Sequence, residues 1–190
     1  ALSVAAEAGA NPFSGEEADA EELLHGLLRQ AVSGQLMAEV PLGAFLSGGI
    51  DSTAVVALMQ AAAQEPVRTF TIGFSDSGYD ESESAKRIAN HLGTAHRTCI
   101  LGARDALAII PLMPAFYSEP FADASQIATA LVSRVAREEV TVALSCDGGD
   151  EVFGGYNRYV WGESLFRRTR CFPRWSRSLL RNALLAASPS

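Results

Sequence analysis

Two short stretches of the sequence combine residue types that could bind an anion and support chemistry on it. The first stretch, Ser47–Ser52, reads SGGIDS and lies between an apolar run and a helical pattern. Glycines allow a backbone to approach a ligand closely, and a helix N-terminus directs N–H groups and the positive end of its dipole at that ligand. The hydroxyl groups of Ser47, Ser52 and Thr53 add further hydrogen-bond donors. This arrangement predicts a phosphate-binding loop.

The loop differs from the two best-known phosphate loops. The Walker pattern requires Gly-Lys-Ser/Thr at the start of the helix, and no lysine lies near Ser47–Ser52. The dinucleotide-binding pattern requires a later glycine, which residues 54–57 do not supply. The hexapeptide instead resembles the pyrophosphate loop of the N-type ATP pyrophosphatases, the PP-loop enzymes. An ordinary strand–helix turn is the alternative, but such a turn needs one glycine and not this set of residues.

The second stretch is acidic and also follows a strand pattern. Residues 145–156 read SCDGGDEVFGGY and come after the apolar run Val140–Ser145. Ligands of an open parallel sheet sit outside the carboxyl ends of its strands, so the two stretches can face one crevice. An exposed acidic turn would explain the second stretch by itself, but it would not explain the pairing with the first.

The carboxylates of the two stretches predict a cation site. Acidic side chains beside a bound phosphate would repel it unless a cation were present. Mg²⁺ is a hard ion that binds one or two carboxylates together with phosphate oxygens. We therefore expect Asp51 and Asp150 to hold Mg²⁺.

The segments around these stretches alternate between strand and helix patterns. Strands are expected at residues 40–46, 67–74, 96–101 and 140–145. Helices are expected from 18 to about 34, from the phosphate loop to about 63, from Asp80 to Gly93, over 103–113 and over 125–138, with a polar turn at 75–79. The alternation predicts an α/β fold, a doubly wound open parallel sheet with helices on both faces. Residues 1–16 are expected to form a linker or mobile arm, with one domain over 17–190.

The C-terminal segment is rich in arginine. Seven arginines fall between residues 158 and 181, interleaved with Trp161, Phe166, Phe172 and Trp175. A nucleic-acid surface is one interpretation. A helical surface whose aromatic residues pack inward is favoured, because the remainder of the chain is acidic.

Composition narrows the class of protein. The chain has 190 residues, 48% hydrophobic and 19% charged, with a formal net charge of −7, which is typical of a globular protein and unfavourable for nucleic-acid binding. Its three cysteines show no metal-ligand spacing, and the three histidines are expected to have surface or packing roles. No apolar run reaches transmembrane length and no signal peptide is evident, so a cytoplasmic protein without a membrane partner is expected.

Six sequence blocks, in order, resemble the synthetase domain of the glutamine-dependent asparagine synthetase family. The resemblance covers about residues 20–160. The blocks are Val40–Gly43 leading into Ser47–Ser52, Thr71–Phe74, Tyr79–Glu81, Leu92–Thr94, Glu119–Pro120 with Asp123 and Ser125–Ile127, and Leu144–Tyr156.

This resemblance implies an adenine nucleotide alpha hydrolase-like, PP-loop ATPase fold and an ATP-dependent synthesis of asparagine. Aspartate would attack ATP to give β-aspartyl-AMP, and ammonia derived from glutamine would then displace AMP. Asp147 would be the catalytic residue, and Asp51 and Asp150 would hold Mg²⁺. The residues implied to contact ATP are Leu46 and Ile72 near the adenosine, Ser47, Gly48, Gly49, Asp51 and Ser52 around the pyrophosphate, and Ser145 and Cys146.

The chain departs from the family pattern at several points. Asp147 stands where glutamate is usual, and Cys146 stands where glycine is usual. The family's N-terminal glutaminase domain is not recognisable, and the lysine that neutralises pyrophosphate would lie beyond residue 190, so a chain truncated at its C-terminus is expected. The alternatives are an adenylating amide or lactam synthetase for another acid, and a nucleotide-binding fragment without catalysis. A homodimer is left open.

Overall fold

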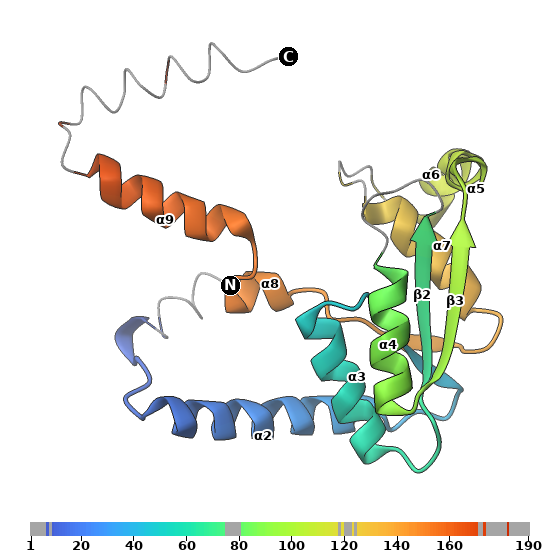
Figure 1. Cartoon of the computed structure of the whole chain (residues 1–190), viewed down its shortest axis with the longest axis horizontal. Coiled ribbons are helices and arrows are strands. Elements are labelled where there is room, and N and C mark those ends of the chain that lie inside the picture. Colours follow the sequence, from blue (N-terminus) through green and yellow to red (C-terminus); the bar gives the residue numbers. More distant parts are fainter. Residues whose placement is uncertain are drawn as a thin grey trace. The chain divides into compact units, whose positions relative to one another are not determined.

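The computed structural model describes residues 7, 9–74, 81–117, 119, 123, 125–170, 173 and 182 (Figure 1). The chain forms two compact units, Ala1–Cys146 and Asp147–Ser190, and each unit is described by itself. The predicted turn at 75–79 and the predicted helix cap Asp80 lie outside the described residues.

Four parallel strands form the sheet of the first unit. Their order is β3-β2-β1-β4, so the chain crosses from β1 to β2 and β3 on one side and then returns to place β4 on the other side of β1. This reversal defines a doubly wound sheet and confirms the predicted fold class. The strands are β1 (Leu42–Phe45), β2 (Arg68–Phe74), β3 (Ala95–Leu101) and β4 (Val142–Leu144).

Helices cover both faces of this sheet. Successive side chains of a strand point to opposite faces, and apolar side chains lie on both of them. On one face Ala44 and Leu46 pack with buried residues of α3 (Ile50–Ala62) and α4 (Ser82–Leu92). On the other face Phe70 packs against α7 (Ser125–Ala136), and Leu101 packs with α5 (Ala103–Ile109). Figure 1 shows α4 beside β2, and α7 behind β2 and β3.

The helix ends follow local chemistry. Helix α4 ends at Gly93, which has a positive φ of 73°, a conformation that glycine adopts without strain. At the start of α7 the Ser125 N–H donates to Asp123 Oδ1 at 2.8 Å, and this bond lowers the pKa of Asp123.

The helix predicted over 103–113 is wrong as a single helix. It divides into α5, a 3₁₀ turn at Ile110–Leu112 and the short α6 (Met113–Phe116). The reason is that Pro111 and Pro114 have no N–H group and cannot continue the hydrogen-bond ladder of an α-helix.

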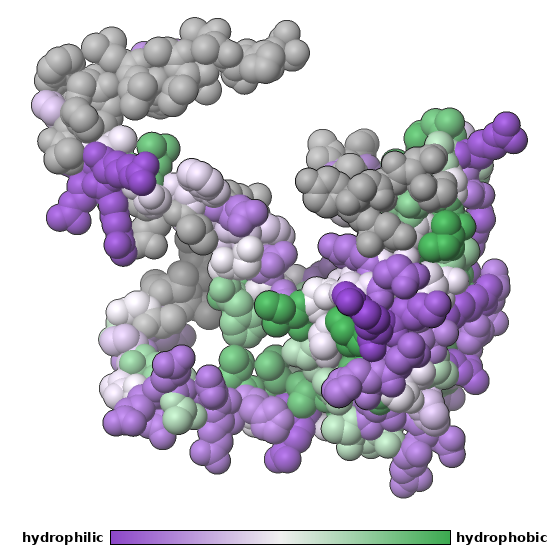
Figure 2. Space-filling view, viewed as in Figure 1, coloured by the Kyte–Doolittle hydropathy of each residue, from purple (hydrophilic) through white to green (hydrophobic). Residues whose placement is uncertain are grey.

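Helix α2 (Glu17–Gln35) projects from the first unit (Figure 1). Its one buried residue is Val32, near the C-terminal end. Leu23, Leu24 and Leu27 are exposed, and Figure 2 shows apolar side chains along α2 beside a largely hydrophilic surface. The predicted helical periodicity is confirmed, while its apolar stripe remains uncovered within the described residues of this unit.

The second unit contains two described helices, α8 (Gly149–Phe153) and α9 (Asn157–Thr169). The prediction that the aromatic residues of this segment pack inward is wrong for Trp161 and Phe166, which are 73% and 61% exposed. The described residues of the unit include no strand and no second long helix for α9 to pack on. Phe172 and Trp175 lie outside the described residues. Nowhere in the described chain is a helix long and apolar enough to span a membrane.

Candidate functional site

The predicted phosphate loop follows the central strand at the switch point of the sheet. Strand β1 has β2 on one side and β4 on the other, and open parallel sheets bind ligands at the carboxyl ends of such strands. In the register of β1 with β4, Ala44 pairs with Leu144, so Ser145 and Cys146 leave the sheet beside the end of β1. The first unit thus brings Ser47–Ser52 and Ser145–Cys146 to neighbouring strand ends.

Three residues of the loop form a closed ring of hydrogen bonds. Ser52 Oγ donates to the Gly49 carbonyl at 3.2 Å, and the Gly49 N–H donates to Ser47 Oγ at 3.3 Å. The two serine hydroxyls lie 3.0 Å apart. Because the Ser52 proton is used on Gly49, the Ser47 hydroxyl is the donor of this third bond. The ring holds the loop in a defined shape, with Ser52 only 2% exposed.

The same loop presents unpaired backbone donors. Within the part of the chain that the structure describes, the N–H groups of Gly48, Ile50, Asp51 and Ser52 have no hydrogen-bond acceptor, and the first helical bond runs from the Thr53 N–H to Gly49 at 3.1 Å. Unpaired donors at a helix N-terminus, together with the helix dipole, favour an anion. Residues of these types can therefore hold a phosphate group.

Gly48 is the tightest point of the loop. Its φ of +86° is a left-handed conformation, and a Cβ at this position would lie 3.0 Å from the Ala85 amide nitrogen and 3.2 Å from the Ser84 Cβ. The first turn of α4 therefore packs directly on the loop. Sequence reasoning missed Ser84; a hydroxyl early in the next helix is the only sequence signal for it.

Leu46 and Ile72 both lie beside the start of the loop. The Leu46 side chain is 1% exposed and belongs to the core beneath α3, so only its backbone could contact a ligand. Its N–H donates to the Phe70 carbonyl at 3.0 Å, which marks the level at which β1 ends. Because β2 continues to Phe74, Ile72 lies beside the start of the loop, with its half-buried side chain packed towards α7.

The predicted acidic residues divide between the two units. Asp51 is half-buried in the first turn of α3. In the second unit Asp147 is exposed and Asp150 is half-buried in α8. Among the described residues no group of three or more histidine, cysteine, aspartate or glutamate side chains could hold a metal ion. Two carboxylates suit Mg²⁺ only if phosphate oxygens or water complete its ligands.

The geometry of the second unit explains its paired glycines. Gly148 and Gly154 have φ of +96° and +71° and bound the short helix α8 at its two ends. A Cβ on Gly155 would collide with Asp150 Oδ1, because the carboxylate lies against this glycine. Glycine at 155 therefore leaves room for the Asp150 side chain, while Glu151 accepts a hydrogen bond from the Tyr156 hydroxyl at 2.7 Å.

Thr71 is a second residue that sequence reasoning did not assign to the site. It is 4% exposed, and its hydroxyl donates to the carbonyl of Leu46, the residue that precedes the loop. A hydroxyl at a buried position between Phe70 and Ile72 is the signal that could have identified it.

The histidines occupy surface and packing positions, as predicted. His25 and His91 are exposed. The ring of His96 is half-buried near the amino ends of β2 and β3, with Nδ1 2.9 Å from Thr69 Oγ1 and Nε2 3.0 Å from Thr98 Oγ1. Burial, and secondly the charge of Lys86, lower the pKa of His96.

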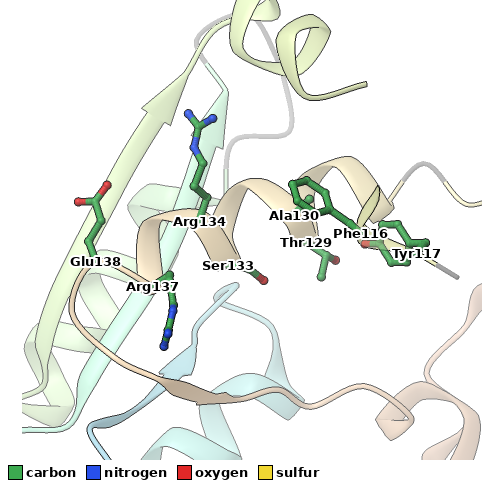
Figure 3. A pocket seen from close by; sticks show the side chains of 8 residues that line it. All are labelled: Phe116, Tyr117, Thr129, Ala130, Ser133, Arg134, Arg137 and Glu138. Atoms are coloured by element: carbon green, nitrogen blue, oxygen red, sulfur yellow. The ribbon is translucent and has the colours of Figure 1, made fainter. Parts of the chain in front are cut away.

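A groove of about 650 Å³ runs along α7 and α6, and none of the predicted site residues lines it. Its walls include Phe116 and Tyr117 at one end and Arg134 and Arg137 at the other (Figure 3). In Figure 3 the two arginines point to opposite sides of α7, so their charges do not converge on one anion. The chemistry of the loop, and not the size of this groove, identifies the candidate site.

Comparisons with known proteins agree with the loop chemistry. A family model described as asparagine synthase matches residues 23–189. A protein of Methanocaldococcus jannaschii, assigned as asparagine synthetase (glutamine-hydrolyzing) 2, is 43% identical over 137 residues, 72% of this chain and 26% of that protein. Asparagine synthetase (glutamine-hydrolyzing) 1 of Bacillus subtilis is 33% identical over 148 residues, 78% of this chain and 23% of that protein.

The chain spans about a quarter of the length of these relatives. Among solved structures, the NH3-dependent NAD synthetase of Campylobacter jejuni aligns with a TM-score of 0.47 and 16% identity, over 72% of this chain and 60% of that chain. This likeness is too low to add to the argument.

Proposed function

The chain belongs to the asparagine synthase family, and on this premise we propose that it supplies the ATP-binding part of a synthetase that makes asparagine from aspartate. The observation that carries the proposal is the loop after β1, where unpaired N–H groups meet at the switch point of a parallel sheet. The loop would bind the pyrophosphate portion of ATP.

The proposed reaction has two steps. A carboxylate oxygen of aspartate forms a bond to the α-phosphorus, and the bond between the α-phosphorus and the bridging oxygen to the β-phosphate breaks, which releases pyrophosphate. Ammonia, obtained from glutamine elsewhere in the protein, then bonds to the activated carbonyl carbon, the bond from that carbon to the AMP oxygen breaks, and the nitrogen releases a proton as AMP leaves. Asp147 is proposed to act near the activated carboxyl group.

The residues of the loop would assist the first step by stabilising charge. The N–H groups of Gly48, Ile50 and Asp51 would donate to phosphate oxygens, and their donation strengthens as negative charge moves onto the leaving pyrophosphate. Leu46 would present backbone atoms to the adenosine portion. Ser145 and Cys146, at the neighbouring strand end, would form the opposite side of the nucleotide site.

The carboxylates of Asp51 and Asp150 suit Mg²⁺ in chemical type, since both are oxygen ligands that are neither fully buried nor fully exposed. When bound, Mg²⁺ would neutralise the charge of the pyrophosphate. The proposed role of the protein is to hold the two carboxylates and the loop donors at the same phosphate groups.

The test is aspartate-dependent exchange between ATP and pyrophosphate. We expect exchange by the wild-type protein and a loss of about 100-fold in Asp51→Ala, because this variant lacks a proposed ligand of the Mg²⁺ that would neutralise the pyrophosphate. The matched control is Glu83→Ala, which removes an exposed carboxylate from the first turn of α4 and should exchange normally.

Two results would contradict the proposal. Exchange that requires a different carboxylic acid, with none for aspartate, would reassign the substrate. Exchange that Asp51→Ala and Glu83→Ala lower to the same degree would remove Asp51 from the site.

A further inference from the structure

The backbone of the phosphate loop is anchored from the neighbouring strand, and we propose that Thr71 is the positioning residue that does this. Its hydroxyl fixes the peptide between Leu46 and Ser47, and through that peptide it sets the shape of the loop. This inference deepens the proposed function and depends on it wherever ATP is the ligand.

At the Leu46 carbonyl, a hydrogen bond from a side chain replaces the backbone hydrogen bond that the sheet would make. In a parallel ladder the Leu46 N–H would donate to Phe70, as it does at 3.0 Å, and the Ile72 N–H would donate to the Leu46 carbonyl. Within the described residues that second bond is not made, and the Thr71 hydroxyl is the sole donor to this carbonyl. The ladder thus ends at Leu46 without leaving its carbonyl unsatisfied.

The same peptide unit connects Thr71 to the ring of hydrogen bonds. Its N–H belongs to Ser47 and donates to Ser52 Oγ at 3.3 Å. Ser52 in turn bonds to Gly49, so one rotation of this peptide would disturb donors on both sides of Gly48. A continuous chain of bonds therefore runs from a buried residue of β2 to the donors of the loop.

Packing by itself does not require a hydroxyl at this position. Thr71 is 4% exposed and points to the face of the sheet that carries Leu46 and the buried residues of α3. Valine has nearly the same shape and would avoid the desolvation of a polar group. A buried hydroxyl is stable here because Leu46 accepts its proton, so the hydrogen bond is what distinguishes threonine from valine.

Thr69 provides a matched control. It lies two residues earlier on β2, points to the same face, is fully buried, and bonds through its hydroxyl to Thr94 and His96 at 3.0 and 2.9 Å. These partners lie at the amino ends of the strands, away from the loop. Thr69→Val removes an equally buried hydroxyl that does not reach the phosphate loop.

The experiment measures ATP binding by calorimetry with Mg²⁺ present, on the wild type, Thr71→Val, Thr71→Ser and Thr69→Val. We expect Thr71→Val to raise the Kd by about tenfold, since one hydrogen bond and the loop geometry that depends on it are lost. Thr71→Ser keeps the hydroxyl and should bind within about twofold of the wild type. Thr69→Val should lower Tm by at least as much as Thr71→Val and leave the Kd within about twofold.

A Kd that is unchanged in Thr71→Val, or raised equally in Thr69→Val, would overturn the assignment. A second readout separates this inference from the proposed function. Amide hydrogen exchange without ligand should be faster at Ser47 and Gly49, whose N–H groups are hydrogen-bonded in the loop, in Thr71→Val but not in Thr69→Val. A wild type that binds no ATP would contradict the proposed function, and the exchange rates would then decide the role of Thr71: no difference between the two valine variants refutes it.

Discussion

A single glycine, Gly48, meets two independent steric demands. Its φ of +86° would strain any other residue, and the space beside it is occupied by the backbone of Ala85. From the sequence, the glycines of the loop are expected because a ligand must approach closely. The structure adds the approach of a second helix, which could not be predicted because it depends on how α4 packs in three dimensions.

Protonation of His96 destabilises the folded protein. Both ring nitrogens lie within 3.0 Å of threonine hydroxyls, and burial is the main cause that lowers its pKa below the ordinary value of 6.5. In the unfolded chain this histidine takes up a proton near pH 6.5, whereas in the folded protein it does so only at lower pH. The unfolded state therefore binds more protons in this window, and stability decreases as the pH falls.

We expect the free energy of unfolding to fall between pH 7.5 and pH 5.5 and this fall to be smaller in His96→Asn, which cannot take up a proton. Urea unfolding at several pH values measures both quantities. The variant is expected to be less stable than the wild type at pH 7.5, where the wild-type ring is neutral and hydrogen-bonded. Parallel pH profiles for the two proteins would show that His96 is not responsible for the slope.

At the scale of elements, α2 shows that a sequence pattern can predict a helix correctly without predicting which of its residues are buried. The acidic first turn and the spacing of leucines predict this helix, and the Glu16 N–H donates to Asp19 Oδ2 at 3.0 Å at its start. Of its apolar residues, Val32 is 6% exposed and Leu27 is 54% exposed. The helix is therefore tied to the first unit chiefly by its C-terminal part.

The difference in burial between Val32 and Leu27 predicts different losses of stability for their substitution by alanine. Val32→Ala should lower the free energy of unfolding by about 2 kcal/mol, because it leaves a cavity against the core of α3. Leu27→Ala removes a larger side chain and should cost at most about 0.5 kcal/mol, because that side chain remains in water. Denaturant unfolding of both variants provides the comparison. A cost for Leu27→Ala equal to or above that of Val32→Ala would show that the leucine stripe is covered in solution.

The sequence predicts some of the other strands and helices better than others, and each difference has a physical reason. Strands β2 and β3 and helices α3, α4 and α7 follow from strong periodicity and clear end signals such as Gly93. The helix boundaries between Ala103 and Phe116 are harder to predict from the sequence. The pattern of apolar residues continues through two prolines, but the backbone cannot continue as one α-helix there. Strand β4 is only three residues long, because the register with β1 ends at Leu144.

At the scale of the whole molecule, the candidate site depends on the sheet topology. Alternation of strands and helices predicts a parallel sheet, and the order β3-β2-β1-β4 then places the carboxyl ends of β1 and β4 side by side. Sequence reasoning could infer this neighbourhood from the general rule for such sheets. It could not infer the support that Thr71 gives to the loop, because that bond joins residues 25 positions apart.

The proposal that Asp51 and Asp150 are both ligands of Mg²⁺ predicts coupled effects of their substitution. Asp51 belongs to the first unit and Asp150 to the second. If both carboxylates hold one Mg²⁺, Asp51→Ala and Asp150→Ala should each weaken magnesium-dependent ATP binding by about tenfold, and the double variant should be little weaker than either single variant.

The control for this coupling combines Asp150→Ala with Glu83→Ala, which removes a carboxylate of the first unit that is not proposed to bind metal. That pair should behave as Asp150→Ala alone. A double Asp51/Asp150 variant in which the two losses multiply to about 100-fold would show that the carboxylates act independently.

The closed ring at Ser47, Gly49 and Ser52 bears on the heat released when a ligand binds. Without ligand, these hydroxyl and N–H groups already satisfy one another, so any bond they make to a phosphate oxygen replaces a bond that is lost. The ring therefore adds little to the enthalpy of binding, which comes instead from the unpaired N–H groups of Gly48, Ile50 and Asp51. What the ring supplies is a loop already fixed in shape before the ligand arrives, so little conformational entropy is lost on binding.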